Sequence, residues 1–181
     1  MSTNDVNFGI GYATGMFYHA PADTALPTYP TETLGAGWVE AGYIGADGIV
    51  FSPAVANEQL KDWSRTIRRM LPSEDSPTVQ APIISTTGES LKTLFGPVAS
   101  SAASSAHGAT TAVTITANTM TDPEAFLFIG KDGDDTFMLG TTKGYVSTVD
   151  DITFAPGEAV TWNATITADA WTFMKDDGQT T

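Results

Sequence analysis

Apolar and polar residues alternate along much of the chain, most regularly toward its end. In 160–168 every second residue is apolar, and the residues between them are threonine or asparagine. The apolar side consists of Val160, Trp162, Ala164, Ile166 and Ala168. Because successive side chains of a β-strand point to opposite faces, this pattern predicts a half-buried strand. The same period predicts strands over 113–117 and 63–71, and hence a mainly β protein.

One stretch is apolar at consecutive positions rather than at alternate ones. Phe126, Leu127, Phe128 and Ile129 follow one another without a polar residue. In a β protein such a strand is covered on both faces, by the domain core or by a neighbouring subunit. Phe126 and Phe128 are therefore candidate subunit-interface residues.

Turn residues predict three hairpins. Asp47-Gly48 and Asp132-Gly133 each lie between strand-like runs, and Asp-Gly supplies the positive φ values that a tight turn requires. A looser hairpin is predicted through the loop 72–77, which is flanked by prolines. Pro82 in the strand that follows predicts an edge position or a bulge, because proline has no backbone N–H to donate.

One helix is predicted, over about 87–96. Thr86 followed by Glu89 matches a capping box, and behind it apolar residues recur at helical spacing: Leu91, Leu94 and Phe95. Gly96-Pro97 ends the helix. Its single apolar stripe would close one open face of a β-sandwich.

Two internal segments lack a periodic apolar face. Residues 20–37 form a long loop rich in proline and glycine, and 99–109 contain only Ala, Ser, His and Gly, as a flexible linker does. The predicted organisation is an N-terminal arm over 1–7, a single β domain over 8–171 and a C-terminal tail over 172–181. We expect the loop, the linker and both terminal segments to be mobile in the free subunit.

Amino-acid composition excludes several classes of function. The 181 residues suit one domain, and 21 acidic against 8 basic residues give a formal net charge of −13. Sequence-independent binding of nucleic acid is disfavoured, because it depends on clustered Lys and Arg. Without cysteine there is no disulfide, thiolate zinc site or Cys nucleophile. No apolar stretch reaches the length of a membrane span, so no membrane association is expected.

Candidate chemistry is sparse. His19 and His107 are the only imidazoles, and nucleophile-elbow, phosphate-binding and zinc-protease motifs are missing. His19 fits a surface or loop histidine better than a catalytic one. The run Asp132-Gly133-Asp134-Asp135 lacks the ligand spacing of a calcium loop. We therefore expect no enzyme, no catalytic residue, no cofactor and no metal.

Half of the basic residues lie within nine positions: Lys61, Arg65, Arg68 and Arg69. On a strand Arg65 and Arg69 point one way and Arg68 the other, so a single basic face for nucleic acid does not result. Glu74 and Asp75 are candidate partners across the predicted hairpin. In so acidic a chain this strip fits an acidic surface of another subunit, which makes Arg65, Arg68 and Arg69 candidate interface residues.

The order of sequence blocks resembles the major tail protein, or tail tube protein, of long non-contractile-tailed bacteriophages (siphophages). The resemblance spans about residues 8–170 and is specific only when the blocks are taken together. The blocks are GMFYHAPADTALPT at 15–28, GWVEAGYI at 37–44, DGI at 47–49, SEDSPT at 73–78, SLKTLFG at 90–96 and FAPGEAVTWNATITA at 154–168.

The resemblance implies a β-sandwich or β-barrel tail-tube fold with one short flanking helix, an extended loop and terminal arms. It implies a structural subunit of sixfold rings, stacked into a tube whose lumen holds the tape measure protein and then conducts double-stranded DNA into the host. Further implied partners are the tail terminator and tail tip proteins, with assembly in the bacterial host cytoplasm and a final place in the virion tail. The ring-stacking residues implied in the 20–37 loop are Pro21, Leu26, Pro27, Tyr29 and Pro30.

An acidic lumen would suit DNA passage, because it repels phosphates and lets DNA slide without specific binding. If the basic strip is used between subunits, the remaining carboxylates are free to supply that potential. The candidates are Asp122, Glu124, Asp132, Asp134, Asp135, Asp150 and Asp151.

The alternative function is a carbohydrate-binding β-sandwich on a virion surface or in a secreted protein, with exposed tryptophans as sugar platforms. The candidates are Trp38, Trp63, Trp162 and Trp171. Trp162 alternates with core residues, which favours packing over binding. A small β-rich enzyme has only His19 near acidic residues in its favour.

Overall fold

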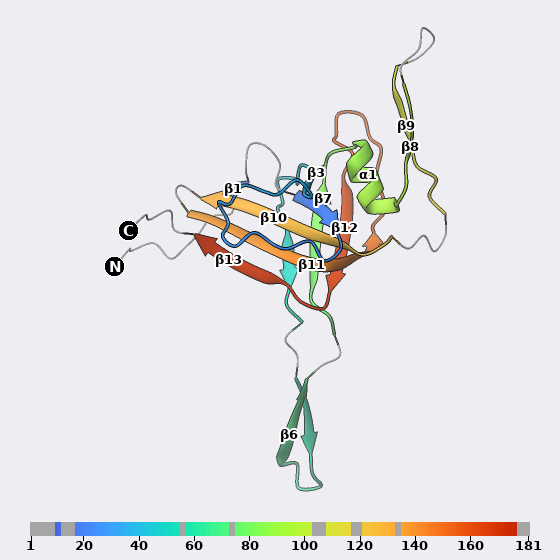
Figure 1. The fold of residues 1–181 in the computed structure, drawn as a ribbon. Coiled ribbons are helices and arrows are strands. Elements are labelled where there is room, and N and C mark those ends of the chain that lie inside the picture. Colours follow the sequence, from blue (N-terminus) through green and yellow to red (C-terminus); the bar gives the residue numbers. More distant parts are fainter. Residues whose placement is uncertain are drawn as a thin grey trace.

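The computed structural model describes residues 10–11, 17–54, 57–72, 75–102, 108–116, 121–132 and 135–176. In this part of the chain the fold is mainly β with one helix, as the sequence pattern predicts, and most strands join one antiparallel sheet (Figure 1). Its strands in spatial order are β3 (Val39–Gly42), β2 (Phe17–Pro21), β10 (Glu124–Asp132), β11 (Asp135–Val149), β12 (Trp162–Ala168), β7 (Thr78–Ile83) and β4 (Val50–Ser52). Two more strands attach to the middle: β1 (Ile10–Gly11) pairs with β10, and β13 (Thr172–Asp176) pairs with β11.

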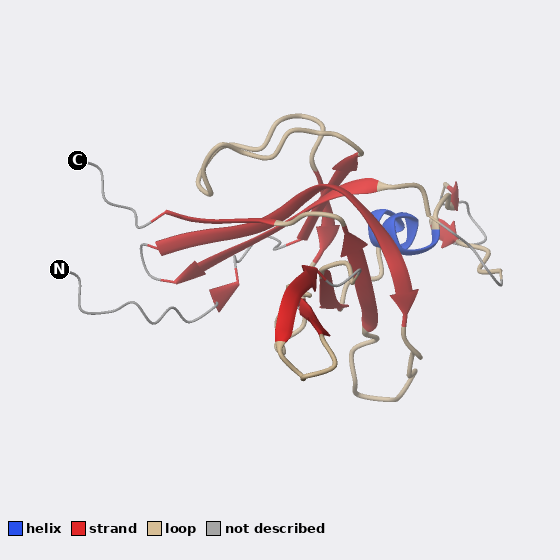
Figure 2. Cartoon of the chain, turned by 90° about the horizontal axis from the view of Figure 1, so that it is seen from below, coloured by secondary structure: helices blue, strands red, loops and turns tan. Residues whose placement is uncertain are grey.

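The β10–β11 hairpin is the centre of the sheet. Asp132 pairs with Asp135, which confirms the hairpin predicted at Asp132-Gly133, although residues 133 and 134 lie outside the described part. The first half of β11 pairs with β13 and its second half with β12. β11 therefore connects the part of the sheet that contains β13 with the part that contains β12. Strands β10 and β13 run nearly across the direction of β7 and β12 in Figure 1, and Figure 2 shows the same arrangement from below.

The sheet folds over a common core. One buried apolar cluster contains Phe17 of β2 and Phe128 of β10 together with Ile83 of β7 and Ile166 of β12. Because β2 and β7 are separated by three strands in the sheet, they can share a core only if the sheet turns back on itself. The result is a sandwich with two layers, one around β2 and β10 and one around β12 and β7.

Helix α1 (Gly88–Phe95) closes this core, and its apolar residues Leu91 and Leu94 belong to the main cluster. Its N-cap is Thr87, whose hydroxyl accepts a hydrogen bond from the Ser90 amide at 3.1 Å. The capping box lies one residue later than the predicted Thr86 and Glu89, because Thr86 accepts a hydrogen bond from the Trp162 indole instead. The helix ends at Gly96 with a positive φ of 86°, as predicted.

Strand β12 confirms the alternation at the end of the sequence, since its buried residues are those of the predicted apolar side. The strand predicted over 113–117 is wrong for residues 113–116, and Ala117 lies outside the described part. Residues 110–112 form β9 (Thr110–Ala112), which pairs with β8 (Ala99–Ser101), and Ile115 is exposed outside any strand. The start of the predicted 99–109 linker is thus a strand that pairs with residues just beyond its end, and residues 103–107 lie outside the described part. Threonine and alanine in alternation specify an extended chain, but not where its pairing begins.

The third predicted hairpin is also wrong. The strand β6 (Ile67–Pro72) pairs with β5 (Asn57–Lys61) in a separate two-stranded sheet, whereas β7 pairs with β12 and β4. Residues 62–66 form the turn of this β5–β6 hairpin, in which Arg65 has a φ of 63°. Of the strand predicted over 63–71, only the residues from Ile67 onward form a strand, because the residues before Ile67 form the turn.

The turn at Asp47-Gly48 is present, with Gly48 at a φ of 71°, but its flanking strands do not pair with each other. Ile44 and β4 both run along β7, and residues 45–49 loop out opposite Ala81 and Pro82. Pro82 is therefore not on an edge strand, because β7 lies between β12 and β4. The pairing is interrupted on the neighbouring segment, where residues 45–49 leave the sheet. The carbonyl of Pro82 still accepts a hydrogen bond from the Gly45 amide at 2.7 Å.

The predicted tail over 172–181 begins with an ordered strand. Residues 172–176 form β13, which pairs with β11 from Thr136 to Gly140. Met174 on this strand packs against a second buried cluster made of Leu127, Ile129 and Met138. The sheet thus extends to Asp176.

Candidate assembly surfaces

The doubly apolar strand is covered on both faces within one chain. Phe126 and Phe128 are 1% and 3% exposed, and the ring of Phe128 stacks on Phe17 with centroids 4.8 Å apart. On the opposite face, Leu127 and Ile129 belong to the second buried cluster. This corrects the expectation that a neighbouring subunit buries Phe126 and Phe128, because the single chain leaves neither ring exposed for such a contact.

The long loop over 20–37 is the cover of that second face. Pro21 ends β2, after which Leu26, Leu34 and Trp38 pack on the cluster. Of the residues implied for ring stacking, Pro27 and Pro30 are buried, Leu26 is half-buried, and Pro21 and Tyr29 are exposed.

Polar contacts also hold this loop to the sheet. The Asp23 amide donates to the Thr142 carbonyl at 2.8 Å, and the Thr31 hydroxyl donates to the Asp176 carboxylate at 2.9 Å. Because Leu26 and Leu34 pack on the second cluster, the expectation that the loop lacks an apolar attachment is wrong. Its spaced apolar residues follow no regular period, so a periodicity search does not detect them.

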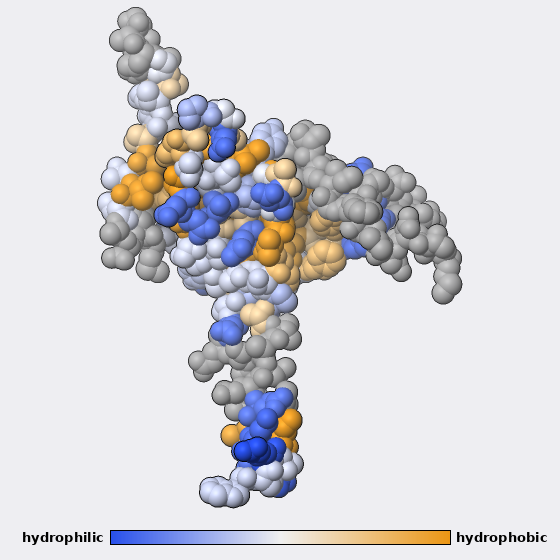
Figure 3. Space-filling model, turned by 180° about the vertical axis from the view of Figure 1, so that it is seen from behind, coloured by the Kyte–Doolittle hydropathy of each residue, from blue (hydrophilic) through white to orange (hydrophobic). Residues whose placement is uncertain are grey.

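The β5–β6 hairpin, called the basic arm below, projects from the sheet (Figure 1). Arg65, Arg68 and Arg69 are all exposed on it, and Trp63 in its turn is fully exposed. Figure 3 shows strongly hydrophilic and hydrophobic residues side by side on this arm. The sequence pattern predicted that Trp63 lies on a strand over 63–71. The signal for a turn was the set of polar residues around it, Asp62, Ser64, Arg65 and Thr66.

Asp62 organises the turn of the basic arm. Its carboxylate accepts hydrogen bonds from the Ser64 hydroxyl at 2.6 Å, the Thr66 amide at 3.0 Å and the Arg68 Nε at 2.6 Å. These donors, the Ser64 hydroxyl foremost, hold the pKa of Asp62 below its ordinary value. Arg68 thus pairs with Asp62 and not across the hairpin predicted from sequence, and Arg65 lies in the turn instead of on a strand face.

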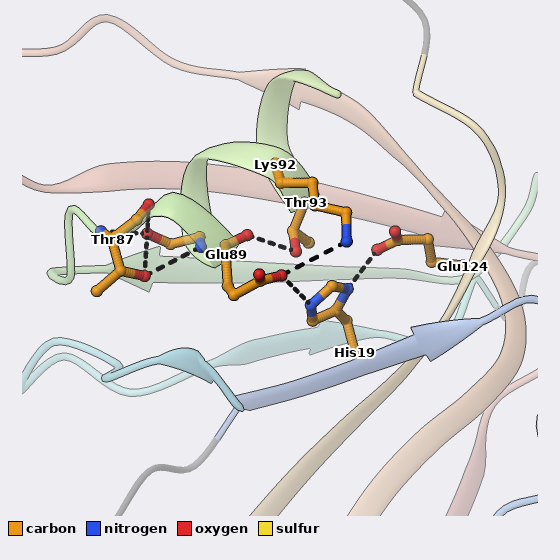
Figure 4. Close-up of polar contacts among 7 residues, drawn as sticks. His19, Thr87, Glu89, Lys92, Thr93 and Glu124 are labelled. Atoms are coloured by element: carbon orange, nitrogen blue, oxygen red, sulfur yellow. Dashed lines mark hydrogen bonds and ion pairs between the residues drawn. The ribbon is translucent and has the colours of Figure 1, made fainter. Parts of the chain in front are cut away.

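His19 is buried, contrary to the surface or loop position expected for it. Its Nδ1 lies 2.9 Å from the Glu124 carboxylate, and its Nε2 lies 3.5 Å from the Glu89 carboxylate (Figure 4). Lys92 is 3.5 Å from the same Glu89 oxygen. These contacts connect β2, β10 and α1. Among the described residues, the His, Cys, Asp and Glu side chains form no group of three or more that would hold a metal ion.

One face of the second layer carries mainly uncharged polar residues on β12 and β7. The outward residues of β12 are Asn163, Thr165 and Thr167, and their partners on β7 include Gln80 and Thr78. On the adjacent β11 the Ser147 hydroxyl donates to the Thr165 carbonyl at 3.0 Å. This face therefore presents hydroxyl and amide groups without a charge among the residues named.

Two of the carboxylates expected to be free are already paired. Glu124 contacts His19, and Asp135 contacts Lys175 at 2.9 Å. Asp122, Asp150 and Asp151 are exposed, whereas the side chain of Asp132 and all of Asp134 lie outside the described part. Glu124 and Asp135 are therefore not the free carboxylates expected from the sequence.

In the described residues, the β-sandwich has an exposed arm and outermost strands, β3 and β4, that pair on one side only, so it is a subunit that can assemble through its edges. The family model for the phage tail tube protein matches residues 1–178, and the chain belongs to this family. No curated protein matches the sequence.

Membership in this family confirms the resemblance to a phage tail tube protein. The protein is a structural subunit of a bacteriophage tail tube, it self-assembles into that tube, and its place is the virion tail. A structural family of this kind points to a protein without enzymatic activity. Among the described residues, no helix is long and apolar enough to cross a membrane.

Proposed function

We propose that the subunit forms sixfold rings, stacked into the tail tube of a siphophage, whose lumen holds the tape measure protein and then conducts double-stranded DNA during ejection. The observation that carries this proposal is the pair of free edges at the two ends of the sheet. In the described part of the chain, β3 pairs only with β2, and β4 pairs only with β7. Free edges present unpaired N–H and C=O groups, which neighbouring subunits in a ring would satisfy.

The open face of β12 and β7 is the surface we assign to the lumen. Its outward residues on β12, and Gln80 and Thr78 beside them on β7, are polar, and their hydroxyl and amide groups carry no positive charge to retain phosphates. The net charge of −13 adds a repulsive background for DNA. DNA would then pass without specific binding.

The same proposal includes the other proteins of the tail as partners. The tail terminator and tail tip proteins would contact the ends of the tube, and assembly would take place in the bacterial host cytoplasm. The 20–37 loop would contribute to ring stacking through its exposed residues Pro21 and Tyr29, while Leu26, Pro27 and Pro30 hold the loop in place.

Microscopy of the purified protein tests the proposal. Negative staining over a range of protein concentrations is expected to show rings or tubes, and class averages of end views are expected to show sixfold symmetry. End views with another symmetry would contradict the hexamer, and featureless monomers at every concentration and salt would contradict self-assembly of the free subunit.

The carbohydrate-binding alternative depends on exposed tryptophans, and Trp63 alone is fully exposed. Trp162 is buried and donates to Thr86, Trp171 donates to the Pro77 carbonyl at 3.3 Å, and Trp38 covers the second cluster. Binding of labelled glycans that is lost in Trp63→Ala would support this alternative.

A further inference from the structure

The basic arm has large apolar residues that are exposed in the part of the chain that the structure describes. In the described part of the chain β5 and β6 pair only with each other, and Leu60, Trp63 and Ile67 are all exposed on them. An isolated two-stranded hairpin is marginally stable in water, and large exposed apolar side chains usually mark a contact surface. Among the side chains that the structure describes, Arg65 and Arg69 form no ion pair.

The strand register places the arm at one end of the sandwich. The chain leaves the sheet for the arm after Ser52 and returns at Thr78, and these two residues pair with each other. β7 then runs away from the arm to Ile83, which pairs with Trp162 at the start of β12. A strand of this length spans roughly 20 Å. The loop that precedes Trp162 is therefore at the opposite end of the sandwich from the arm, as Figure 1 also shows.

That loop, residues 150–161, is called the β11–β12 loop. It carries three exposed carboxylates, Asp150, Asp151 and Glu158, and Phe154 at its middle is 74% exposed. The Asp150 amide donates to the Asn163 carbonyl at 2.9 Å, which ties the start of the loop to β12. The loop thus has an aromatic residue among negative charges, while the arm has an aromatic residue among positive charges.

We propose that the basic arm of one subunit binds the β11–β12 loop of a subunit in the next ring of the tube. This inference rests on the proposed function, and it names the partner of the arm as a second copy of this chain. Trp63 and Phe154 would be the apolar anchors, and Arg65 and Arg69 would face Asp150 and Asp151 around them.

The direction of growth follows from this contact. Because the two surfaces differ and lie at opposite ends of the subunit, the contact is heterologous and leaves a free arm or a free loop at each end of the stack. Each added ring therefore presents the same surface as the one before it, so the stack extends without closing on itself.

Charge reversal tests the pairing. The arm variant is Arg65→Glu with Arg69→Glu, the loop variant is Asp150→Lys with Asp151→Lys, and the combined variant carries all four changes. We expect each of the first two to require a protein concentration at least about tenfold higher for tube formation, because like charges then face each other. The combined variant restores opposite charges and is expected to form tubes near the wild-type concentration. Sedimentation and negative staining measure the result.

A matched control separates the contact from net charge. Lys131→Glu with Lys143→Glu changes the net charge by the same amount as the arm variant, at exposed sites on β10 and β11. We expect it to form tubes at less than about threefold higher concentration, since exposed charges outside a contact have small effects. Circular dichroism is expected to show the same melting temperature for the arm variant and the wild type, because Arg65 and Arg69 are exposed and belong to neither buried cluster.

The outcomes distinguish this inference from the function it rests on. Tubes of the arm variant at the wild-type concentration, or a combined variant that stays unassembled while each variant folds, would overturn the arm–loop contact and leave the tube intact. A wild-type protein that forms neither rings nor tubes would overturn both. Single sixfold rings of the arm variant that do not stack would support the contact directly.

Discussion

The imidazole of His19 and the carboxylate of Glu124 lie 2.9 Å apart, Nδ1 to Oε2, although 105 residues separate them in the chain. A carboxylate accepts and does not donate, so Nδ1 carries the proton in this hydrogen bond. The Nε2 side of the same ring faces Glu89 of α1. His19 therefore joins the helix to two strands of the first layer at a buried position.

Removing either partner of this pair is expected to destabilise the fold. We expect His19→Ala and Glu124→Ala each to lower the free energy of unfolding by about 1–3 kcal/mol, because the remaining partner keeps its partial burial without its hydrogen bond. A double-mutant cycle from urea denaturation measures the coupling. Glu40→Ala, at an exposed carboxylate on β3, is the control and is expected to change stability by less than about 0.5 kcal/mol. Additive effects in the cycle would show that the pair contributes nothing.

Phe128 is expected to be a stability residue rather than an assembly residue. Phe128→Ala is expected to cost about 3–5 kcal/mol, because it leaves a cavity beside Phe17 and removes a stacked pair. Phe128→Asp is expected to prevent folding of the single subunit. Phe173→Ala on β13, where the ring is 65% exposed, is the control and is expected to stay within about 1 kcal/mol of the wild type. Thermal melting of unassembled protein distinguishes the two roles. A folded, stable Phe128→Asp monomer that fails to assemble would show that Phe128 is a subunit-interface residue.

The turn of the basic arm is expected to loosen in acid. The pKa of Asp62 lies below its ordinary value of 3.8, chiefly because the Ser64 hydroxyl and then the Thr66 amide donate to its ionised form. A carboxyl whose pKa is lower in the folded turn stabilises that turn while it is ionised. This contribution is complete above pH 3.8 and disappears as the pH falls through the lowered pKa.

Nuclear magnetic resonance can follow this titration at the Thr66 amide. Its chemical shift is expected to change with a midpoint below 3.8, and Asp62→Asn is expected to abolish the change. A midpoint at or above the ordinary value would mean that the donors do not hold the carboxylate in solution.

Chemical labelling tests which sheet face lines the lumen. The chain has no cysteine, so Asn163→Cys on the open face of β12 introduces a single reactive thiol. We expect this thiol to react readily with a bulky maleimide in the free subunit and to be protected in the assembled tube, because access is then limited to the tube ends. Lys92→Cys, on the exposed side of α1 and outside the proposed contacts, is the comparison and is expected to be more reactive than Asn163→Cys in tubes. Equal reactivity of the two sites in tubes would remove β12 from the lumen.

The features that sequence alone determined depend on neighbours in the chain. Strict alternation over 160–168 identified β12 and its buried side, and the doubly apolar run at 126–129 identified a strand covered on both faces. A glycine with a positive φ ended α1 at Gly96, and the hairpin at Asp132-Gly133 joined strands adjacent in sequence. In each case side-chain alternation, a cap or a tight turn acts within a few residues.

Tertiary structure alone decided which strands pair and what covers them. Alternation shows which side of a strand is buried but carries no information about its partner, so β6 was assigned to β7 although it pairs with β5. In the same way, the 20–37 loop, rather than a second subunit, covers the outer face of β10. His19 became a buried link only when β2, β10 and α1 met, because contacts over more than 100 residues depend on the closed sheet and not on local sequence.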